Sequence, residues 1–214
     1  MLVLAFDTAT PAVTAALHDG ERVLAESTTI DARRHGELLA PTIQAVLAEA
    51  GASLRDVTAV VAGSGPGPYT GLRVGLMTAQ ALATTLAIPA YGICTLDAVA
   101  YGSGRDEPFI AATDARRKEV FWARYADRRT RVSGPAVDRP ADVPVEGLPV
   151  AGAGAVLYPD ALGEPLDPPY PYAGALAGLA VERLAAGAAL DPARPIYLRR
   201  PDAVVPGAPK RVTA

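Results

Sequence analysis

The side chains that could do chemistry in this chain are few, and acidic groups are the best placed among them. Asp7 and Asp114 each follow an apolar, strand-like run, and Thr8 and Thr10 add hydroxyl groups beside Asp7. Carboxylates and hydroxyls at the ends of two buried strands suit a magnesium nucleotide held in a cleft between two lobes. A turn or capping role for Asp7 is an equally good interpretation, because neither turn has the glycine that lets a backbone approach phosphates.

The other residues give little indication of a catalytic metal centre or a catalytic nucleophile. The two histidines, His18 and His35, are not spaced as a pair on one helix, so no catalytic metal centre is expected. Ser64 lies in Gly-Ser-Gly-Pro-Gly, which is not the nucleophile elbow of serine hydrolases. Cys94, the single cysteine, has no base beside it in sequence, and a buried thiol is the simpler interpretation. These residues argue against a hydrolase or protease.

Residues 63–73, Gly-Ser-Gly-Pro-Gly-Pro-Tyr-Thr-Gly-Leu-Arg, form the most distinctive segment. Four glycines and two prolines indicate a shaped loop between a strand and a helix. We expect Thr70 to cap that helix. Neither glycine motif for phosphate binding is present, so a tight strand-to-helix connection is favoured over an anion site. The residues expected to shape the loop are Gly65, Pro66, Gly67, Thr70 and Arg73.

The helix expected after this loop carries small residues at every fourth position. Gly71, Gly75, Ala79 and Ala83 form one smooth ridge. Glycine inside a helix costs about 1 kcal/mol relative to alanine, so close approach of another element should offset that cost. The ridge could pack against the chain's own sheet or against another subunit, and the residue pattern does not choose between them.

Composition limits the classes of function. The chain has 214 residues, of which 50% are hydrophobic, enough for one large domain or two small ones. A net charge of −3 and a pI near 5.4 are not typical of a protein that binds nucleic acid by itself. No basic segment precedes the first apolar run, and polar residues interrupt the apolar stretch at 72–88. We therefore expect no secretory signal, no membrane span and a cytoplasmic protein.

The elements that must position these residues are three strands, then a helix, a strand and a helix. They are expected at residues 2–6, 12–17, 21–28, 37–50, 57–62 and up to about residue 87. After a polar Gly/Pro stretch the pattern restarts, with strands at 109–113 and 119–125. The sequence predicts an α/β protein of two tandem βββαβα units, the second divergent, with lobes at 1–104 and 105–214 and a Pro-rich tail.

Five segments resemble one known family in their order and spacing. They are Phe6-Asp-Thr-Ala-Thr10, Arg34-His-Gly-Glu-Leu-Leu-Ala-Pro41, Gly65-Pro-Gly-Pro-Tyr-Thr-Gly-Leu-Arg73, Asp114-Ala-Arg-Arg-Lys-Glu-Val120 and Tyr197-Leu-Arg199. Over nearly its whole length the chain resembles the TsaB family, the dimerisation subunit of the bacterial tRNA threonylcarbamoyladenosine system. Gly36 and Pro68 depart from the family pattern, in which serine is usual at both positions.

The resemblance implies a two-lobed actin-like (ASKHA, RNase H-like) fold without catalysis of its own. TsaB-like proteins pair with TsaD, a catalytic paralogue with a metal site, and work with TsaE, an ATPase. Their assembly transfers threonylcarbamoyl to the adenosine beside the anticodon, so this chain would meet tRNA only indirectly. Asp7, Thr8, Thr10 and Asp114 would then be a vestigial nucleotide site, and binding of ATP or ADP at the subunit junction is left open.

The resemblance also implies that the small-residue helix is the dimer interface. The residues that it assigns to the partner are Gly71, Leu72, Gly75, Leu76, Thr78, Ala79 and Leu82. The same face would allow self-association when TsaD is missing. On this interpretation Gly75→Leu blocks TsaD binding in a folded subunit, whereas internal packing predicts unfolding. The alternative function is an ATP-dependent kinase or ATPase of the same fold, supported by the turn at Asp7.

Overall fold

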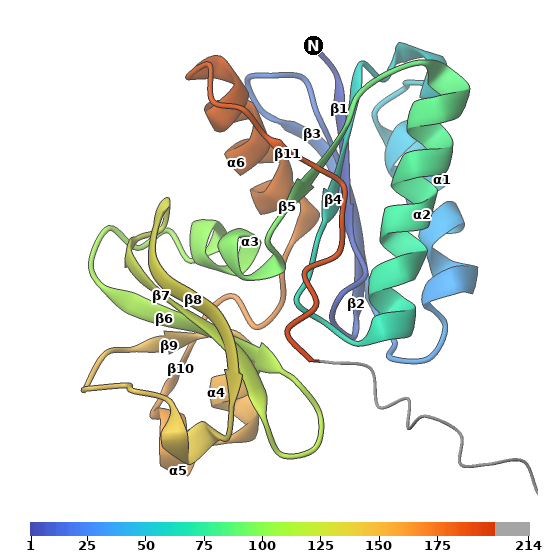
Figure 1. The fold of residues 1–214 in the computed structure, drawn as a ribbon. Coiled ribbons are helices and arrows are strands. Elements are labelled where there is room, and N and C mark those ends of the chain that lie inside the picture. Colours follow the sequence, from blue (N-terminus) through green and yellow to red (C-terminus); the bar gives the residue numbers. More distant parts are fainter. Residues whose placement is uncertain (200–214) are drawn as a thin grey trace, which may run out of the picture.

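The computed structural model describes residues 1–199 of the chain, and two β-sheets organise them into two lobes (Figure 1). The first lobe contains β1 (Val3–Asp7), β2 (Ala12–His18), β3 (Val23–Ile30), α1 (His35–Glu49), β4 (Ala59–Gly63), α2 (Tyr69–Leu86), β5 (Ala90–Ile93) and α3 (Thr95–Gly102). The chain continues through β6 (Phe109–Asp114), β7 (Val120–Asp127), β8 (Thr130–Asp138), β9 (Val150–Ala151), α4 (Ala153–Leu157), α5 (Pro159–Leu162), β10 (Pro165–Leu166), α6 (Ala173–Ala185) and β11 (Asp191–Pro192).

The two sheets have the same internal order. The first runs β11-β5-β4-β1-β2-β3 and the second β10-β9-β6-β7-β8. Apart from the added edge strand β11, each strand of one sheet has a counterpart in the other. In both sheets the central strand pairs antiparallel with the next strand in the chain and parallel with its other neighbour. This duplication confirms the predicted two-lobed, actin-like α/β architecture.

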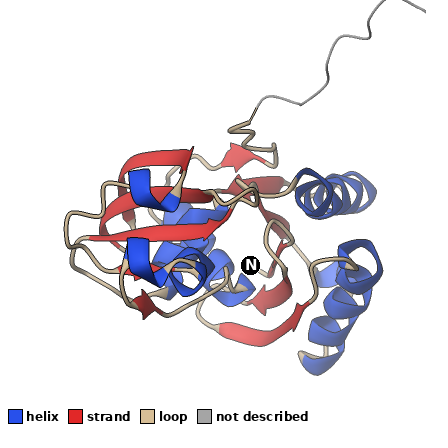
Figure 2. Ribbon diagram, turned by 90° about the horizontal axis from the view of Figure 1, so that it is seen from below, coloured by secondary structure: helices blue, strands red, loops and turns tan. Residues whose placement is uncertain are grey.

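The first sheet is covered on both faces, and its central strand β1 is apolar from Val3 to Phe6. On β1, Leu4 and Phe6 point into a core shared with α1 and α2, while Val3 and Ala5 point into a core shared with α6. Figure 2 shows the two long helices α1 and α2 side by side at one edge of the molecule. A continuous apolar strand of this kind is typical of a sheet buried between two helical layers.

The second lobe is the divergent one, as predicted. Where the first unit has the long helix α1, the second has only a single 3-10 turn, Pro140–Asp142. The two short helices α4 and α5 cover one face of its sheet, and α3 covers the other. A third strand, β8, follows the two that were expected at 109–113 and 119–125 and runs from Thr130 to Asp138.

The predicted boundary after residue 104 lies just before the second sheet begins, but it does not separate the two lobes. β6, the first strand of the second sheet, begins at Phe109. However, α6 packs on the first sheet and β11 joins its edge beside β5. The chain therefore returns to the first lobe, and the prediction that 105–214 forms one lobe is wrong for this segment. The Pro-rich tail lies outside the described residues. None of the helices described is long and apolar enough to cross a membrane.

Candidate functional site

The turn after β1 directs its polar groups at the chain's own elements, beginning with Asp7. One carboxylate oxygen of Asp7 accepts a hydrogen bond from the Ala9 amide at 2.6 Å, and the other accepts one from the Thr95 hydroxyl at 2.7 Å. The side chain is buried, and burial raises the pKa of Asp7 from its ordinary value of 3.8 to about 6. A Cβ at Gly63 would lie 1.7 Å from this carboxylate, which explains the glycine there.

Thr8, the next residue of the turn, bonds to the backbone of α2. Its hydroxyl donates to the Gly71 carbonyl oxygen at 2.7 Å and accepts from the Gly75 amide at 3.0 Å. In a regular helix, the Gly75 amide would bond directly to the Gly71 carbonyl four residues earlier. The Thr8 hydroxyl therefore bridges the two backbone groups that this helical bond would pair, and it anchors α2 to the turn after β1.

The close contact with Thr8 explains why α2 carries glycines on this row. A Cβ on Gly75 would lie 2.7 Å from the Thr8 hydroxyl oxygen, and one on Gly71 would lie 2.5 Å from the Thr8 carbonyl oxygen. Both distances are shorter than real Cβ contacts. Close approach within the subunit thus accounts for the glycines, and no partner is needed to explain them.

The prediction that seven residues of α2 contact a partner is accordingly wrong for most of them. Five of its seven residues are buried inside the subunit, and only Thr78 and Leu82 are part-exposed. The buried residues are Gly71, Leu72, Gly75, Leu76 and Ala79. A residue whose surface is already covered by its own core cannot contact another chain, so internal packing is the better interpretation of this ridge. A leucine at Gly75 would disrupt folding instead of selectively blocking a partner.

A different row of α2 faces outward, which the sequence reasoning missed. Tyr69 and Met77 are 56% and 52% exposed, large fractions for such side chains. The Tyr69 ring stacks on that of Tyr197, with ring centroids 5.7 Å apart, and the Arg73 guanidinium lies 4.6 Å from the Tyr69 centroid. The spacing of residues 69, 73 and 77 is the signal that could have identified this row. We call Tyr69, Arg73 and Met77 the outer row of α2.

Thr70 does not cap α2 as predicted. The helix begins at Tyr69, one residue before Thr70, and Pro68 occupies the position that precedes its first residue. The Pro68 carbonyl oxygen accepts the first helical bond, from the Leu72 amide at 3.0 Å. Proline has a fixed φ that suits this entry, so the helix starts without a side-chain cap and Thr70 lies exposed in its first turn.

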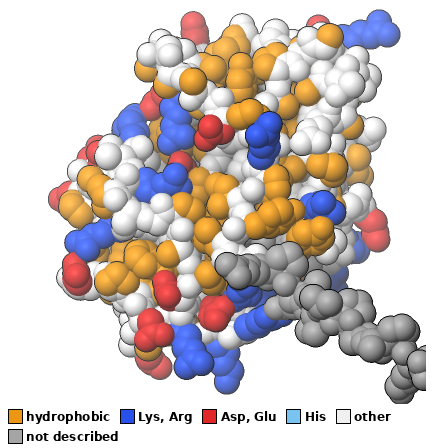
Figure 3. Space-filling model, viewed as in Figure 1, with side chains coloured by type: hydrophobic (Ala, Val, Ile, Leu, Met, Phe, Trp, Pro, Cys, Tyr) orange, Lys and Arg blue, Asp and Glu red, His pale blue; other side chains and the backbone are white. Residues whose placement is uncertain are grey.

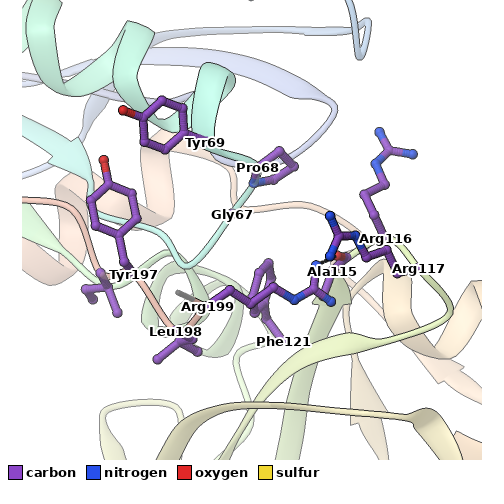
Figure 4. A pocket seen from close by; sticks show the side chains of 11 residues that line it. Gly67, Pro68, Tyr69, Ala115, Arg116, Arg117, Phe121, Tyr197, Leu198 and Arg199 are labelled. Carbon is purple, nitrogen blue, oxygen red and sulfur yellow. Dashed lines mark hydrogen bonds between the residues drawn. The ribbon is translucent and has the colours of Figure 1, made fainter. Parts of the chain in front are cut away.

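A cavity of about 530 Å³ lies where the loop before α2 meets the second lobe. In Figure 4, Tyr69 and Tyr197 lie on one side of it, and Phe121 with the arginines on the other. Hydrophobic side chains also gather on this face of the molecule (Figure 3). Its lining residues are Gly67, Pro68, Tyr69, Ala115, Arg116, Arg117, Phe121, Ile196, Tyr197, Leu198 and Arg199.

The residues of the predicted nucleotide site are not assembled around one space. Thr8 and Thr10 line a smaller cavity of about 280 Å³ together with Arg116, but Asp7 is not among its lining residues. The Thr10 hydroxyl accepts from the Ala12 amide at 3.2 Å. With its carboxylate held by Thr95 and Ala9, Asp7 does not fit the role of a magnesium ligand. The prediction is therefore corrected for Asp7.

Asp114, the other predicted acid, is held in its own turn. It accepts a hydrogen bond from the Arg116 amide at 2.8 Å, and its carboxylate lies 3.3 Å from the Arg116 guanidinium. The arginine extends from this turn toward the cavity that Thr8 and Thr10 line. Asp114 therefore acts as a turn residue that orients Arg116, not as a group open to a metal ion.

The cysteine and the two histidines, the other candidate groups, are placed for structural roles. Burial raises the pKa of the Cys94 thiol to about 12, so the nucleophilic thiolate is scarce at neutral pH. The Nε2 atom of His35 lies 2.8 Å from the Thr10 carbonyl oxygen, and His18 Nδ1 accepts from the Gly20 amide at 3.0 Å. Within residues 1–199 no three metal-ligating side chains cluster together.

A polar cluster around Asp97 joins the two lobes. Asp97, on α3, accepts a hydrogen bond from the Tyr125 hydroxyl at 2.9 Å and lies 3.2 Å from the guanidinium of Arg131. Both partners belong to the second sheet. Arg183, on α6 of the first lobe, reaches the other carboxylate oxygen at 3.2 Å. One buried acid thus ties together three elements from both lobes.

Comparisons with known proteins agree with this architecture. Residues 22–187 match the family model described as TsaD: tRNA N6-adenosine threonylcarbamoyltransferase. An uncharacterised protein of Mycobacterium tuberculosis is 48% identical over 207 residues, which cover 94% of this chain and 93% of that protein. The tRNA threonylcarbamoyladenosine biosynthesis protein TsaB of Escherichia coli is 40% identical over 128 residues, 58% of this chain and 55% of that protein.

A solved structure shows the same fold. It is a crystal structure from Pseudomonas aeruginosa of a protein described as similar to peptidase YEAZ, and it superposes with a TM-score of 0.81. Its sequence is 31% identical, and the match covers 92% of this chain and 99% of that one. The likeness therefore extends over both lobes.

Proposed function

This chain belongs to the TsaB group of the tRNA N6-adenosine threonylcarbamoyltransferase family, and on that premise we propose that it is a subunit of the machinery that makes threonylcarbamoyladenosine in tRNA. Its role is to bind and support a catalytic, TsaD-like paralogue that works with a TsaE-like ATPase. It catalyses no step itself and meets tRNA through its partners.

One observation carries the non-catalytic part of this proposal. The acid best placed for chemistry, Asp7, is buried and accepts hydrogen bonds from Ala9 and Thr95. The Thr8 hydroxyl is likewise engaged, by the backbone of α2. Neither the Asp7 carboxylate nor the Thr8 hydroxyl is therefore free to hold a metal ion, and this favours a supporting role over a kinase or an ATPase.

The outer row of α2 is the surface that we assign to the partner. Exposed tyrosine, arginine and methionine side chains are enriched at protein interfaces. Here Tyr69 and Met77 are more than half exposed, and Arg73 stacks on Tyr69. These residues take over the role that the family resemblance had implied for the buried ridge.

The experiment is a binding measurement between this chain and a TsaD-like subunit. We expect Met77→Glu to weaken the complex at least tenfold, because a charge replaces an apolar contact at the interface. Leu157→Glu is the matched control, since Leu157 is also 52% exposed but lies on α4 of the second lobe. Equal binding by wild type and Met77→Glu would exclude the outer row, and no binding by the wild type would exclude the proposed role.

A further inference from the structure

Thr8 has a role in this structure that neither metal binding nor turn formation explains. Its hydroxyl donates to Gly71 and accepts from Gly75, so both of its hydrogen bonds are made to the backbone of α2. Thr8 is 2% exposed, and water therefore has little access to replace either bond. Loss of the hydroxyl would remove both of these buried hydrogen bonds between the turn and α2.

The bridge lies opposite the outer row. Gly71 and Gly75 are buried on the inner side of α2, whereas Arg73, between them in sequence, is exposed. Any change in the axis of α2 at this point moves Tyr69 relative to Met77, because the turn that Thr8 anchors lies between the two residues. The relative positions of the outer-row side chains thus depend on the hydrogen bonds between Thr8 and the backbone of α2.

We infer that Thr8 is a positioning residue that fixes α2 in the shape its partner recognises. The inference rests on the proposed function, because it takes the outer row as the docking surface. Thr8 acts through α2 and contacts no partner itself. A surface that is held in its binding conformation before association loses less conformational freedom on binding, so the hydroxyl strengthens the complex from inside the subunit.

Thr8→Val tests this inference, because valine keeps the shape of threonine and lacks the hydroxyl. The valine methyl would occupy the place of the oxygen and can make neither hydrogen bond to α2. We expect the dissociation constant of the complex with a TsaD-like subunit to rise about tenfold, as for the loss of one buried hydrogen bond. Thr8→Ser retains the hydroxyl and should restore wild-type affinity.

Thr10→Val is the matched control within the same turn. The Thr10 hydroxyl accepts from the Ala12 amide at 3.2 Å, so the variant loses a bond local to the turn. We expect it to bind the partner as the wild type does. Hydrogen exchange at the Gly75 amide, measured on the isolated chain, supplies a readout that needs no partner and should accelerate in Thr8→Val only.

The outcomes separate this inference from the proposed function. If the wild type binds and Thr8→Val binds equally well, or if Thr10→Val is weakened as much, Thr8 has no positioning role. If the wild type itself fails to bind, the proposed function fails and the inference falls with it. Should Thr8→Val not fold, Thr8→Ala replaces it, because alanine removes the hydroxyl without pressing a methyl group on α2.

Discussion

At the scale of single residues, burial decides what the acids of this chain can do. Asp7 was the natural candidate for a metal ligand, because an aspartate after an apolar strand is a common place for one. The strand and its turn could be predicted from the apolar run that precedes Asp7. The direction of the carboxylate could not, because it depends on Thr95, which lies 88 positions away in the sequence. Long-range partners of this kind leave no local pattern.

The raised pKa of Asp7 predicts a pH dependence of stability. The folded-state pKa of about 6 exceeds the ordinary 3.8, so the folded protein binds more protons than the unfolded chain between these values. The contribution of Asp7 to the free energy of unfolding therefore falls as pH rises from about 4 to about 6, by roughly 2–3 kcal/mol. Urea denaturation at several pH values measures it.

Asp7→Asn isolates this contribution, because asparagine cannot ionise. The other acids contribute equally to both proteins, so the difference between the two pH profiles belongs to Asp7. We expect the variant to gain stability relative to wild type as pH rises through this window. Parallel profiles for the two proteins would show that Asp7 titrates normally and would contradict the burial argument.

At the scale of elements, α2 shows what a sequence pattern can and cannot reveal. Its existence and length follow from the run of helix-forming residues after the Gly-rich loop. Which side faces inward was less clear, because small residues on one row are compatible with either tight internal packing or a subunit contact. The contacts of Thr8 favour internal packing, since its hydroxyl hydrogen-bonds to the backbone of both Gly71 and Gly75. These contacts depend on the tertiary structure and are absent from the periodicity.

Gly75→Ala tests the packing at this point. The added Cβ would lie 2.7 Å from the Thr8 hydroxyl oxygen and displace it, so we expect a loss of about 1–3 kcal/mol in unfolding free energy. The control is Gly36→Ala in α1, where a Cβ meets nothing within 4 Å. That variant should gain up to about 1 kcal/mol from helix propensity. Similar stabilities for the two variants, measured by chemical denaturation, would contradict tight packing at Gly75.

At the scale of the whole molecule, ion pairs between side chains join the two lobes in addition to the chain connections. Asp97 pairs with Arg131 of the second lobe and Arg183 of the first. Beside it, Arg129 forms a bidentate ion pair with Glu182 on α6, at 2.7 and 2.8 Å. The duplicated strand order was predictable from the repeated strand pattern. The return of α6 to the first lobe was not, because its apolar face would fit either sheet.

Asp97→Asn tests this connection. Removing the charge leaves two partly exposed arginines without their shared acid, and we expect a loss of about 1–3 kcal/mol in unfolding free energy. Hydrogen exchange should rise in β7 and β8, which contribute Tyr125 and Arg131. Glu146→Gln is the control, because it breaks an exposed pair with Arg124 and should cost under about 1 kcal/mol. Equal effects of the two variants would show that Asp97 does not join the lobes.

The central claim, that this chain supports catalysis by a partner without performing it, is tested most directly by reconstitution. Unmodified tRNA, threonylcarbamoyl adenylate and ATP are incubated with TsaD-like and TsaE-like proteins, with and without this chain, and modified adenosine is measured. We predict that modification requires this chain together with the TsaD-like subunit and is absent with this chain alone. Modification of tRNA by this chain in the absence of the TsaD-like subunit would contradict the account.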